Sequence, residues 1–333
     1  GDKNNAEARL TKDRALAGLR EFDKALPDLE LLQQQFPTYN DALYELGNVY
    51  VELHNPQKAQ AVYQKLWEGT GPNVKPDIRG FLGLQTLKMQ EGKWQDAVAA
   101  LRDLVQKNPK TLTFRYTLAN FQARAAAGMP GSDPQRKTLL QDAANTYQEI
   151  LKTTANSSDV WLRLGSTQQL LGQNDAALAS YEQASQANPS SAPAFLNRAM
   201  LLELMGQKDK ARDAYNRVLG VDSNNMVALN NLSFLYADSG QNIDQAVTLA
   251  ERAKKNNPNN PNISDTLGYV YLKKGLIDDA YREVQGAGNA QPKNAIYRLH
   301  LAMSRLKRGD KSGAKREAES ALANANHDEQ GQI

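Results

Sequence analysis

Histidine and cysteine are the side chains that most often supply nucleophiles, bases and metal ligands, and this chain of 333 residues is poor in both. It contains no cysteine, which excludes thiolate zinc sites, cysteine nucleophiles and disulfides. Its histidines, His54, His300 and His327, lie far apart in the sequence, and none stands in a metal-ligand spacing. We therefore predict no bound metal and no Ser/His or Cys/His arrangement for nucleophilic catalysis.

Carboxylates and glycine-rich loops give no stronger sign of catalysis. Asp278 and Asp279 are adjacent, but they fall in a predicted turn before a helix, where carboxylates stabilise the helix N-terminus. The sequence has neither a phosphate-binding loop of the GxxxxGK(S/T) type nor a dinucleotide-binding fingerprint. We predict that the chain is not an enzyme and binds no cofactor.

Net charge gives little indication of a partner. The chain has 40 basic and 37 acidic residues, a net charge of +3, whereas nucleic-acid binders usually carry a strong basic stripe. We therefore predict no nucleic-acid partner. Basic residues are concentrated near the end of the chain. We favour the interpretation that they form a solvated helix face, and the alternative that they form a docking site for an acidic partner stays open. These basic residues are Arg298, Arg305, Lys307, Arg308, Lys311, Lys315 and Arg316.

Membrane and targeting segments are not evident in the sequence. No stretch approaches the ~18 apolar residues that a membrane span needs, so we predict no span in this chain. No charged and then apolar leader opens the sequence. Gly1 resembles a cleavage scar, so the removal of a native leader stays open.

The strongest pattern is an internal repeat of small, apolar and aromatic residues. Leu46-Gly47 followed by Tyr50 has a counterpart in Leu267-Gly268 followed by Tyr271, and Leu164-Gly165 falls in the same register. Glycine, alanine, an aromatic residue and proline then follow in a constant order, as in the run Trp161, Leu164, Gly165, Gly172, Ala177, Tyr181, Ala184 and Pro189. This spacing resembles the tetratricopeptide repeat, which has a period of about 34 residues and forms two helices per unit.

The resemblance covers nearly the whole chain. It predicts repeat units at 40–73, 78–111, 112–157, 158–191, 192–225, 226–260, 261–294 and 295–328, followed by a tail at 329–333. Residues 6–39 resemble a degenerate first unit, in which Lys12 and Asp13 stand where an apolar and a small residue belong. Because no earlier repeat would cover this helix, we interpret the polar pair as an end cap.

The resemblance implies an all-α, right-handed superhelical solenoid of about eight or nine helix pairs, spanning residues 1–333 as a single domain. We name the two helices of a unit helix A and helix B. A small residue on helix A, such as Gly268, lets helix B approach closely. We expect left-handed glycines to end helix A at Gly92, Gly172, Gly206, Gly240, Gly275 and Gly309. We expect prolines to stop helix B at Pro109, Pro189, Pro258 and Pro292.

Two stretches depart from the period. Residues 68–76 add about four residues at a repeat junction, and residues 128–134 lengthen the turn inside the third unit by about a dozen. Insertions in repeat proteins sometimes mark a binding face. Lengthening a loop also costs little conformational entropy, so we favour insertions that evolution has merely tolerated over insertions with a function.

The resemblance also implies a binding surface, because in known tetratricopeptide proteins helix A lines the concave face on which ligands usually lie. Apolar and Asn side chains in such a groove favour a peptide partner. Candidate groove residues are Tyr44, Asn48, Leu82, Tyr116, Asn120, Leu162, Leu196, Met200, Asn230, Phe234, Asp265, Tyr269 and Met303. His300 also falls at a position that could face the groove, and we expect it to stand alone.

One binding mode of the family can be tested on the residues. Chaperone-binding members of the family clamp a terminal carboxylate with Lys and Asn. The corresponding positions here hold Tyr44 and Asn48 in one unit, and Leu82 and Thr86 in the next. Since the Lys is missing, we do not predict binding of chaperone C-termini.

A narrower resemblance concerns the segments 230–236 and 265–269, which are similar to bacterial tetratricopeptide proteins of the cell envelope, including those linked to polysaccharide export and surface assembly. We therefore expect a bacterial protein in an extracytoplasmic place, periplasmic or membrane-anchored, with a cytoplasmic one left open. The predicted function is a non-enzymatic scaffold that binds a protein or peptide segment in assembly of an envelope complex. A self-associating structural module and the regulatory part of a larger enzyme stay open, and a monomer is favoured.

Overall fold

The computed structural model describes residues 3–69 and 75–325, and every regular element in this part of the chain is an α-helix. The helices belong to two compact units, which divide in the sequence between Ile150 and Leu151. The all-α prediction is therefore confirmed. A single right-handed superhelix over the whole length stays a prediction.

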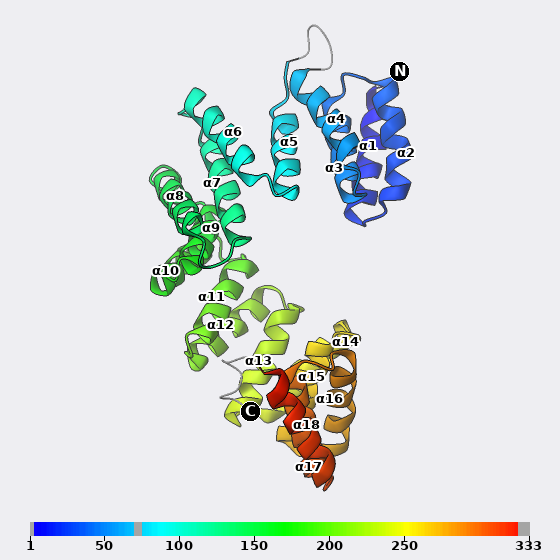
Figure 1. Cartoon of the computed structure of the whole chain (residues 1–333), viewed down its shortest axis with the longest axis vertical. Coiled ribbons are helices and arrows are strands. Elements are labelled where there is room, and N and C mark those ends of the chain that lie inside the picture. Colours follow the sequence, from blue (N-terminus) through cyan, green and yellow to red (C-terminus); the bar gives the residue numbers. More distant parts are fainter. Residues whose placement is uncertain (1–2, 70–74, 326–333) are drawn as a thin grey trace. The chain divides into compact units, whose positions relative to one another are not determined.

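The N-terminal unit is built from antiparallel helix pairs (Figure 1). Consecutive helices from α1 to α7 contact one another, and α3 also contacts α1 and α5, the helices A of the neighbouring pairs. The helices of this unit are α1 (Lys3–Gly18), α2 (Phe22–Gln35), α3 (Asn40–Glu52), α4 (Pro56–Glu68), α5 (Ile78–Gln90), α6 (Trp94–Lys107), α7 (Leu112–Ala127) and α8 (Pro134–Leu151).

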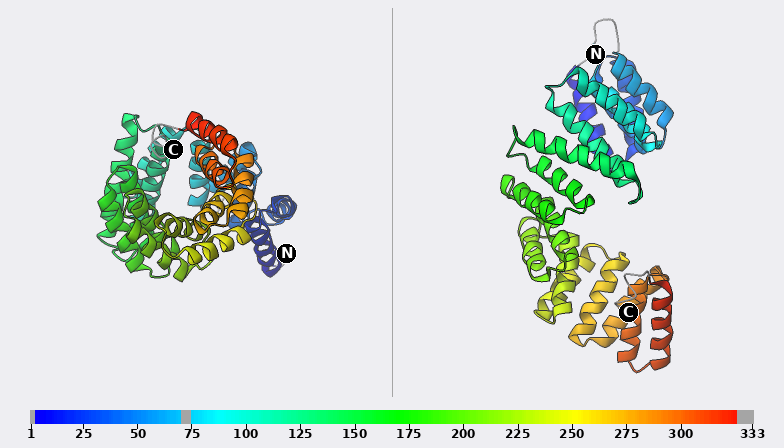
Figure 2. Two further views of the ribbon diagram at one scale, coloured as in Figure 1. Left: turned by 90° about the horizontal axis from the view of Figure 1, so that it is seen from below. Right: turned by 60° about the vertical axis from the view of Figure 1, so that its left-hand side comes forward.

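The C-terminal unit continues the same pattern. Each helix contacts the next one in the sequence, and α13, α15 and α17 form a row of touching helices A (Figure 2). Its helices are α9 (Ser158–Leu170), α10 (Asn174–Ala187), α11 (Ala192–Leu204), α12 (Lys208–Val221), α13 (Met226–Ser239), α14 (Ile243–Asn256), α15 (Pro261–Lys274), α16 (Ile277–Ala290), α17 (Ala295–Lys307) and α18 (Lys311–Asn324).

Left-handed residues separate helix A from helix B in the described pairs other than α7–α8. The six expected glycines have φ between 68° and 89°: Gly92, Gly172, Gly206, Gly240, Gly275 and Gly309. In the first two pairs the equivalent places hold Arg20 and His54, with φ of 61° and 55°. A side chain in this region strains the backbone, so these two residues stand out from the others.

Small residues on helix A and tyrosines on helix B fit together in the core. Tyr63, Tyr147, Tyr181 and Tyr215 are all buried. A Cβ on Gly47 would lie 2.4 Å from the ring of Tyr63, and one on Gly165 would lie 2.6 Å from the ring of Tyr181. The glycines are therefore needed because a tyrosine ring occupies the space in which their side chain would lie.

The insertion inside the third unit lengthens helices more than it lengthens the turn. The connection between α7 and α8 is short, whereas α7 has 16 residues and α8 has 18, against 13 in α3 and α4. The prediction of a turn longer by about a dozen residues is therefore wrong. The insertion at the junction 68–76 lies largely outside the described residues, because these stop at residue 69 and resume at residue 75.

The first helix pair differs from the predicted polar cap at Asp13. Its side chain is fully buried, and neither carboxylate oxygen has a hydrogen-bond partner within the described residues. Asp13 stands 34 residues before Gly47, and Leu29 stands 34 residues before Tyr63. The smaller partner on helix B leaves room for a larger residue on helix A. Lys12 is exposed as expected, but the interpretation of Asp13 as a solvated cap residue is wrong.

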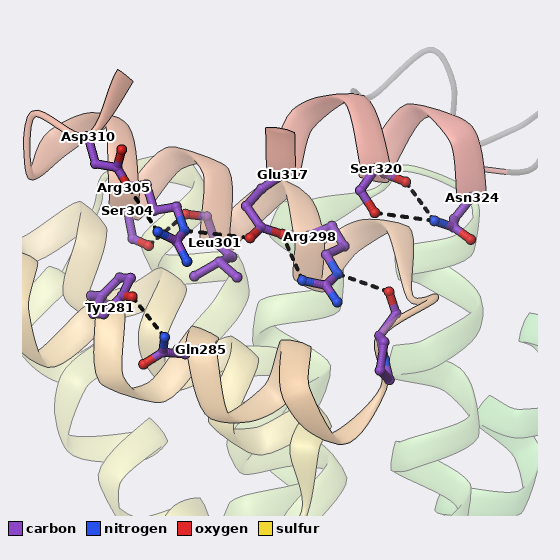
Figure 3. A network of polar contacts seen from close by, with 11 residues as sticks. Tyr281, Gln285, Arg298, Leu301, Ser304, Arg305, Asp310, Glu317, Ser320 and Asn324 are labelled. Carbon is purple, nitrogen blue, oxygen red and sulfur yellow. Dashed lines mark hydrogen bonds and ion pairs between the residues drawn. The ribbon is translucent and has the colours of Figure 1, made fainter. Parts of the chain in front are cut away.

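Three of the basic residues near the end of the chain are neutralised by the chain's own carboxylates. Nη1 of Arg298 donates to Glu317 at 2.7 Å, and Nη1 of Arg305 donates to Asp310 at 2.8 Å (Figure 3). Nε of Arg308 lies 3.1 Å from Asp278, and its guanidinium lies 4.2 Å from the ring centre of Tyr281. These contacts join α16, α17 and α18, which favours a structural role for these arginines over an acidic partner.

Replacing Glu317 by alanine should loosen α18. The Arg298–Glu317 pair is largely shielded, with side chains 18% and 16% exposed, so its loss should lower the local free energy of opening by about 1–2 kcal/mol. Amide hydrogen exchange in α18 would measure this. Glu319→Ala is the control, because Glu319 pairs with Lys315 at 3.8 Å in an exposed place and should contribute little. Equal exchange rates in the two variants would contradict the expectation.

Candidate functional site

The predicted groove residues all lie on helices A, but they differ in how open they are. Met200 and Met303 are exposed by 45% and 36%, whereas Asp265 and Tyr269 are buried, with 5% and 7% of their surface exposed. The remaining residues are half-buried. In the N-terminal unit these are Tyr44, Asn48, Leu82, Tyr116 and Asn120, and in the C-terminal unit they are Leu162, Leu196, Asn230 and Phe234.

A groove between α3 and α5 brings several of these residues together. Tyr44 and Asn48 of α3 and Leu82 and Thr86 of α5 line one cavity of about 250 Å³. Val51, Glu52, Tyr63 and Gly83 complete its wall. We call this cavity the α3–α5 groove. Its residues stand at the equivalent repeat positions of two neighbouring units, which is the arrangement that the resemblance implies.

Tyr63, on helix B, positions Asn48 in this groove. Its ring lies against Gly47 and Gly83, neither of which has room for a Cβ, and its hydroxyl donates to Oδ1 of Asn48 at 2.8 Å. Burial raises the pKa of Tyr63 above its ordinary value, so the hydroxyl keeps its proton. The bond uses the amide oxygen of Asn48 and leaves the two N–H donors of the amide for other partners.

Arg79, near the start of α5, holds Tyr44 of the groove from one side. Its guanidinium lies 5.2 Å from the ring centre of Tyr44 and donates to both Asp41 and Asp77, at 2.6 Å in each case. The guanidinium holds the pKa of Asp77 below its usual value. Arg79 is therefore tied to the protein by two carboxylates and fixes the orientation of Tyr44.

The same tyrosine–asparagine arrangement recurs between α7 and α8. The hydroxyl of Tyr147 donates to Oδ1 of Asn120 at 2.6 Å, and the ring of Tyr116 meets that of Tyr147 edge-on, with centres 6.0 Å apart. Sequence reasoning missed the role of the helix B tyrosines. The sequence spacing could have indicated this role. Tyr63 follows Asn48 by 15 residues, and Tyr181 follows Ser166 by the same number. Each tyrosine hydroxyl donates to the side chain of the earlier residue.

Two further cavities adjoin the α3–α5 groove. One of about 410 Å³ lies between α1 and α3, and its walls include Arg14, Arg20, Glu45, Asn48 and Glu52. The other, of about 480 Å³, lies at the C-terminal ends of α3 and α5 and is lined by Val51, Glu52, His54, Pro56, Leu87, Gln90 and Glu91. Sequence reasoning missed both cavities. The sequence feature that could have indicated them is a residue other than glycine at the turn between helix A and helix B, which is Arg20 in the first pair and His54 in the second.

In the C-terminal unit, Phe234, Asp265 and Tyr269 belong to a stacked ladder rather than to an open groove. The ring of Tyr269 lies between Phe234, at 5.1 Å, and His300, at 4.6 Å between centres. Nδ1 of His300 and Oδ2 of Asp265 are 2.8 Å apart, and both side chains are buried. The expectation that His300 stands alone is therefore wrong. Both of its partners, Asp265 and Tyr269, come from α15, the neighbouring helix A.

This buried pair connects α15 with α17. Among the described residues, no three His, Cys, Asp or Glu side chains come together in a way that could hold a metal ion. Oδ1 of Asp265 is also buried and has no hydrogen-bond partner there. The ladder thus joins three helices A through aromatic stacking and one hydrogen bond. No described helix is long and apolar enough to cross a bilayer.

Comparison with known proteins agrees with the helix pairs. Models of the tetratricopeptide repeat match residues 41–68, 85–111 and 170–225. A solved tetratricopeptide repeat protein from Parabacteroides merdae is similar over 80% of this chain and 94% of its own, with a TM-score of 0.53 and 17% identity. At this identity the likeness concerns the fold alone.

Two other solved structures are similar at lower scores. YrrB, described as a tetratricopeptide repeat protein with an unusual peptide-binding site, has a TM-score of 0.47 and 15% identity, and the match covers 57% of this chain and 97% of YrrB. The yeast Tom70 has a TM-score of 0.45 and 12% identity, with coverage of 99% and 87%. A search among curated proteins found no match.

Repeats of this kind generally act as non-enzymatic modules that hold proteins together. The matched segments cover the pair α3–α4, the second half of α5 with α6, and the helices α10 to α12, and the same glycine turns continue through the rest of the C-terminal unit. The chain is thus a tetratricopeptide repeat protein, a scaffold for contacts between proteins.

Proposed function

We propose that the α3–α5 groove binds a segment of a partner protein in an extended conformation. The observation that carries the proposal is the cavity itself, in which Tyr44, Asn48, Leu82 and Thr86 meet. A volume of about 250 Å³ suits one side chain rather than a whole ligand, since pockets for drug-sized ligands begin near 300 Å³. The partner is therefore a peptide that lies along the groove and inserts one side chain.

The polar and apolar parts of the groove have separate tasks in this proposal. The rings and methyl groups of Tyr44 and Leu82 receive an apolar side chain of the peptide. The N–H groups of Asn48 donate to a backbone carbonyl, because Tyr63 already occupies the amide oxygen. A preset orientation lowers the entropy that the protein loses when the peptide binds.

Selection from a random peptide library, displayed on phage and applied to the whole immobilised chain, tests the proposal. We expect a set of related peptides, and we expect Asn48→Ala to weaken their binding about tenfold, which corresponds to the loss of one hydrogen bond. Tyr63→Phe should weaken binding less, because it frees Asn48 without removing it. Fluorescence anisotropy with labelled synthetic peptides would measure each affinity.

Asn120→Ala is the matched control, because Asn120 has the same tyrosine contact but lies between α7 and α8. It should leave the affinity unchanged. Failure to select any peptide, or equal affinity of the Asn48→Ala and wild-type chains, would overturn the proposal. The role in an envelope complex, the extracytoplasmic location, the self-associating module and the larger enzyme all stay predictions.

A further inference from the structure

The cavity at the C-terminal ends of α3 and α5 adjoins the α3–α5 groove. The two share Val51 and Glu52. Its volume of about 480 Å³ is large enough for a long side chain. A side chain of a peptide in the groove is therefore within reach of this second cavity.

The walls of the cavity combine apolar surface with negative charge. Val51, Leu87 and Pro56 supply the apolar part, and the carboxylates of Glu52 and Glu91 supply the charge. Both carboxylates are accessible, with side chains 48% and 42% exposed. The last residues of α3 and α5, Glu52 and Gln90, also line the cavity, and the terminal carbonyls of a helix carry a partial negative charge.

The chain's own cations already approach both carboxylates from outside. Nη2 of Arg20 lies 3.5 Å from Glu52, and Nζ of Lys93 lies 2.8 Å from Glu91. Both basic side chains are well exposed, at 78% and 61%. Exposed ion pairs of this kind contribute only about 0–1 kcal/mol, so a cation from a partner can replace them at little cost.

His54 completes the wall at a place where later repeats have glycine. Its φ of 55° is one that residues with a side chain rarely adopt. Glycine at this turn would remove the imidazole from the lining of the cavity beside Pro56. The strained residue thus contributes a ring to the wall that a glycine turn would lack.

We propose that this cavity receives a lysine or arginine side chain of the peptide that occupies the α3–α5 groove. The methylene groups of such a side chain lie against Val51, Leu87 and Pro56, and its charged end meets Glu52 and Glu91. The inference rests on the proposed function, because it assigns to the same peptide a basic residue beside the apolar one. The partner is therefore a segment in which an apolar and a basic residue occur close together.

The peptides selected with the wild-type chain provide the probe. We expect lysine or arginine to be enriched at one position, at a constant distance from an apolar residue. A synthetic peptide with norleucine in place of lysine, or citrulline in place of arginine, should bind at least tenfold more weakly. Norleucine keeps the four carbons of lysine and citrulline keeps the length of arginine, and both remove the charge. The double variant Glu52→Gln, Glu91→Gln should also bind the basic peptide at least tenfold more weakly than the wild type does. It should bind the basic peptide and its uncharged counterpart with equal affinity.

A charge reversal separates this inference from a general loss of binding. The variant Glu52→Lys, Glu91→Lys should bind a peptide with glutamate at the selected position more tightly than the wild type does. Glu68→Gln is the control, because Glu68 is exposed at the end of α4 and lies outside the cavity lining. It should change neither affinity.

The outcomes distinguish the two proposals. Selected peptides without a basic preference, or unchanged affinity in the Glu52→Gln, Glu91→Gln variant, would overturn the inference and leave the α3–α5 groove as the binding site. Failure to select peptides, or indifference to Asn48→Ala, would overturn the proposed function and the inference together.

Discussion

Replacing Gly268 by leucine should destabilise the C-terminal unit by about 3 kcal/mol or more. Gly268 lies in α15 where it crosses α16, and a Cβ there would lie 2.4 Å from Cγ1 of Val284. The same Cβ would lie 3.0 Å from the backbone nitrogen of Val284 and 3.1 Å from the carbonyl oxygen of Ala280. A side chain can rotate away, but the backbone of α16 cannot move without separating the two helices.

The effect of Gly268→Leu is measured by urea unfolding together with hydrogen exchange in α15 and α16. The second measurement is needed because repeat proteins open in parts and need not unfold in one step. Gly286→Leu is the control. Gly286 lies in α16, and nothing lies within 4 Å of the position of its Cβ. Its replacement should be neutral or stabilise the helix by about 1 kcal/mol. Similar losses in the two variants would contradict the close crossing of α15 and α16.

The second large effect is a pH dependence caused by Asp13. Burial, and next the negative charge of Asp28, raise the pKa of Asp13 from 3.8 to about 6, although Lys12 and Arg9 oppose the rise. Such a displacement corresponds to about 3 kcal/mol. Since the folded pKa is the higher one, this contribution to stability is complete below about pH 4 and is lost as the pH rises through 6. Above that pH the folded N-terminal unit holds a buried carboxylate without a hydrogen bond.

Asp13→Asn isolates this contribution. The variant cannot ionise, so its stability relative to the wild type should increase by about 2–3 kcal/mol between pH 4 and pH 8. Hydrogen exchange in α1 and α2 at several pH values would measure the difference. Comparison with the wild type is essential, because the neighbouring Asp28 contributes a pH dependence of the opposite sign. Arg9 lowers the pKa of Asp28, so its contribution to stability is lost as the pH falls. A difference between the two proteins that is independent of pH would show that Asp13 ionises normally.

The helices and their ends could be predicted well from the sequence, because each depends on residues close together in the chain. Glycine is the residue that most easily adopts a positive φ, so regularly spaced glycines predict where helix A ends. Pro109, Pro189, Pro258 and Pro292 each stand two residues after the end of a helix B, as expected of residues that cannot continue a helix. The insertion at 128–134 was harder, since extra residues can extend a helix or a turn.

The candidate site could be predicted only in part. Repeat position indicated that Tyr44, Asn48, Leu82 and Thr86 share a face, and they do line one groove. The same positional rule placed Asp265 and Tyr269 in an open groove, whereas both are buried. The rule states which face of a helix a residue occupies. It does not state how large the side chain on the next helix is, and His300 on α17 covers Asp265 and Tyr269.

The sequence by itself determined that this chain consists of helix pairs with small residues at the crossings, because periodicity and glycine spacing are local properties. The tertiary structure alone decided what each crossing contains. Asp13 is buried in a pair where Leu29 stands at the position that Tyr63 has in the next pair, and Asn48 is oriented because Tyr63 reaches it across the pair. The cavity beside Glu52 likewise exists because the ends of two helices meet. Such properties depend on the shapes of side chains that are distant in sequence, and these shapes meet only in the folded chain.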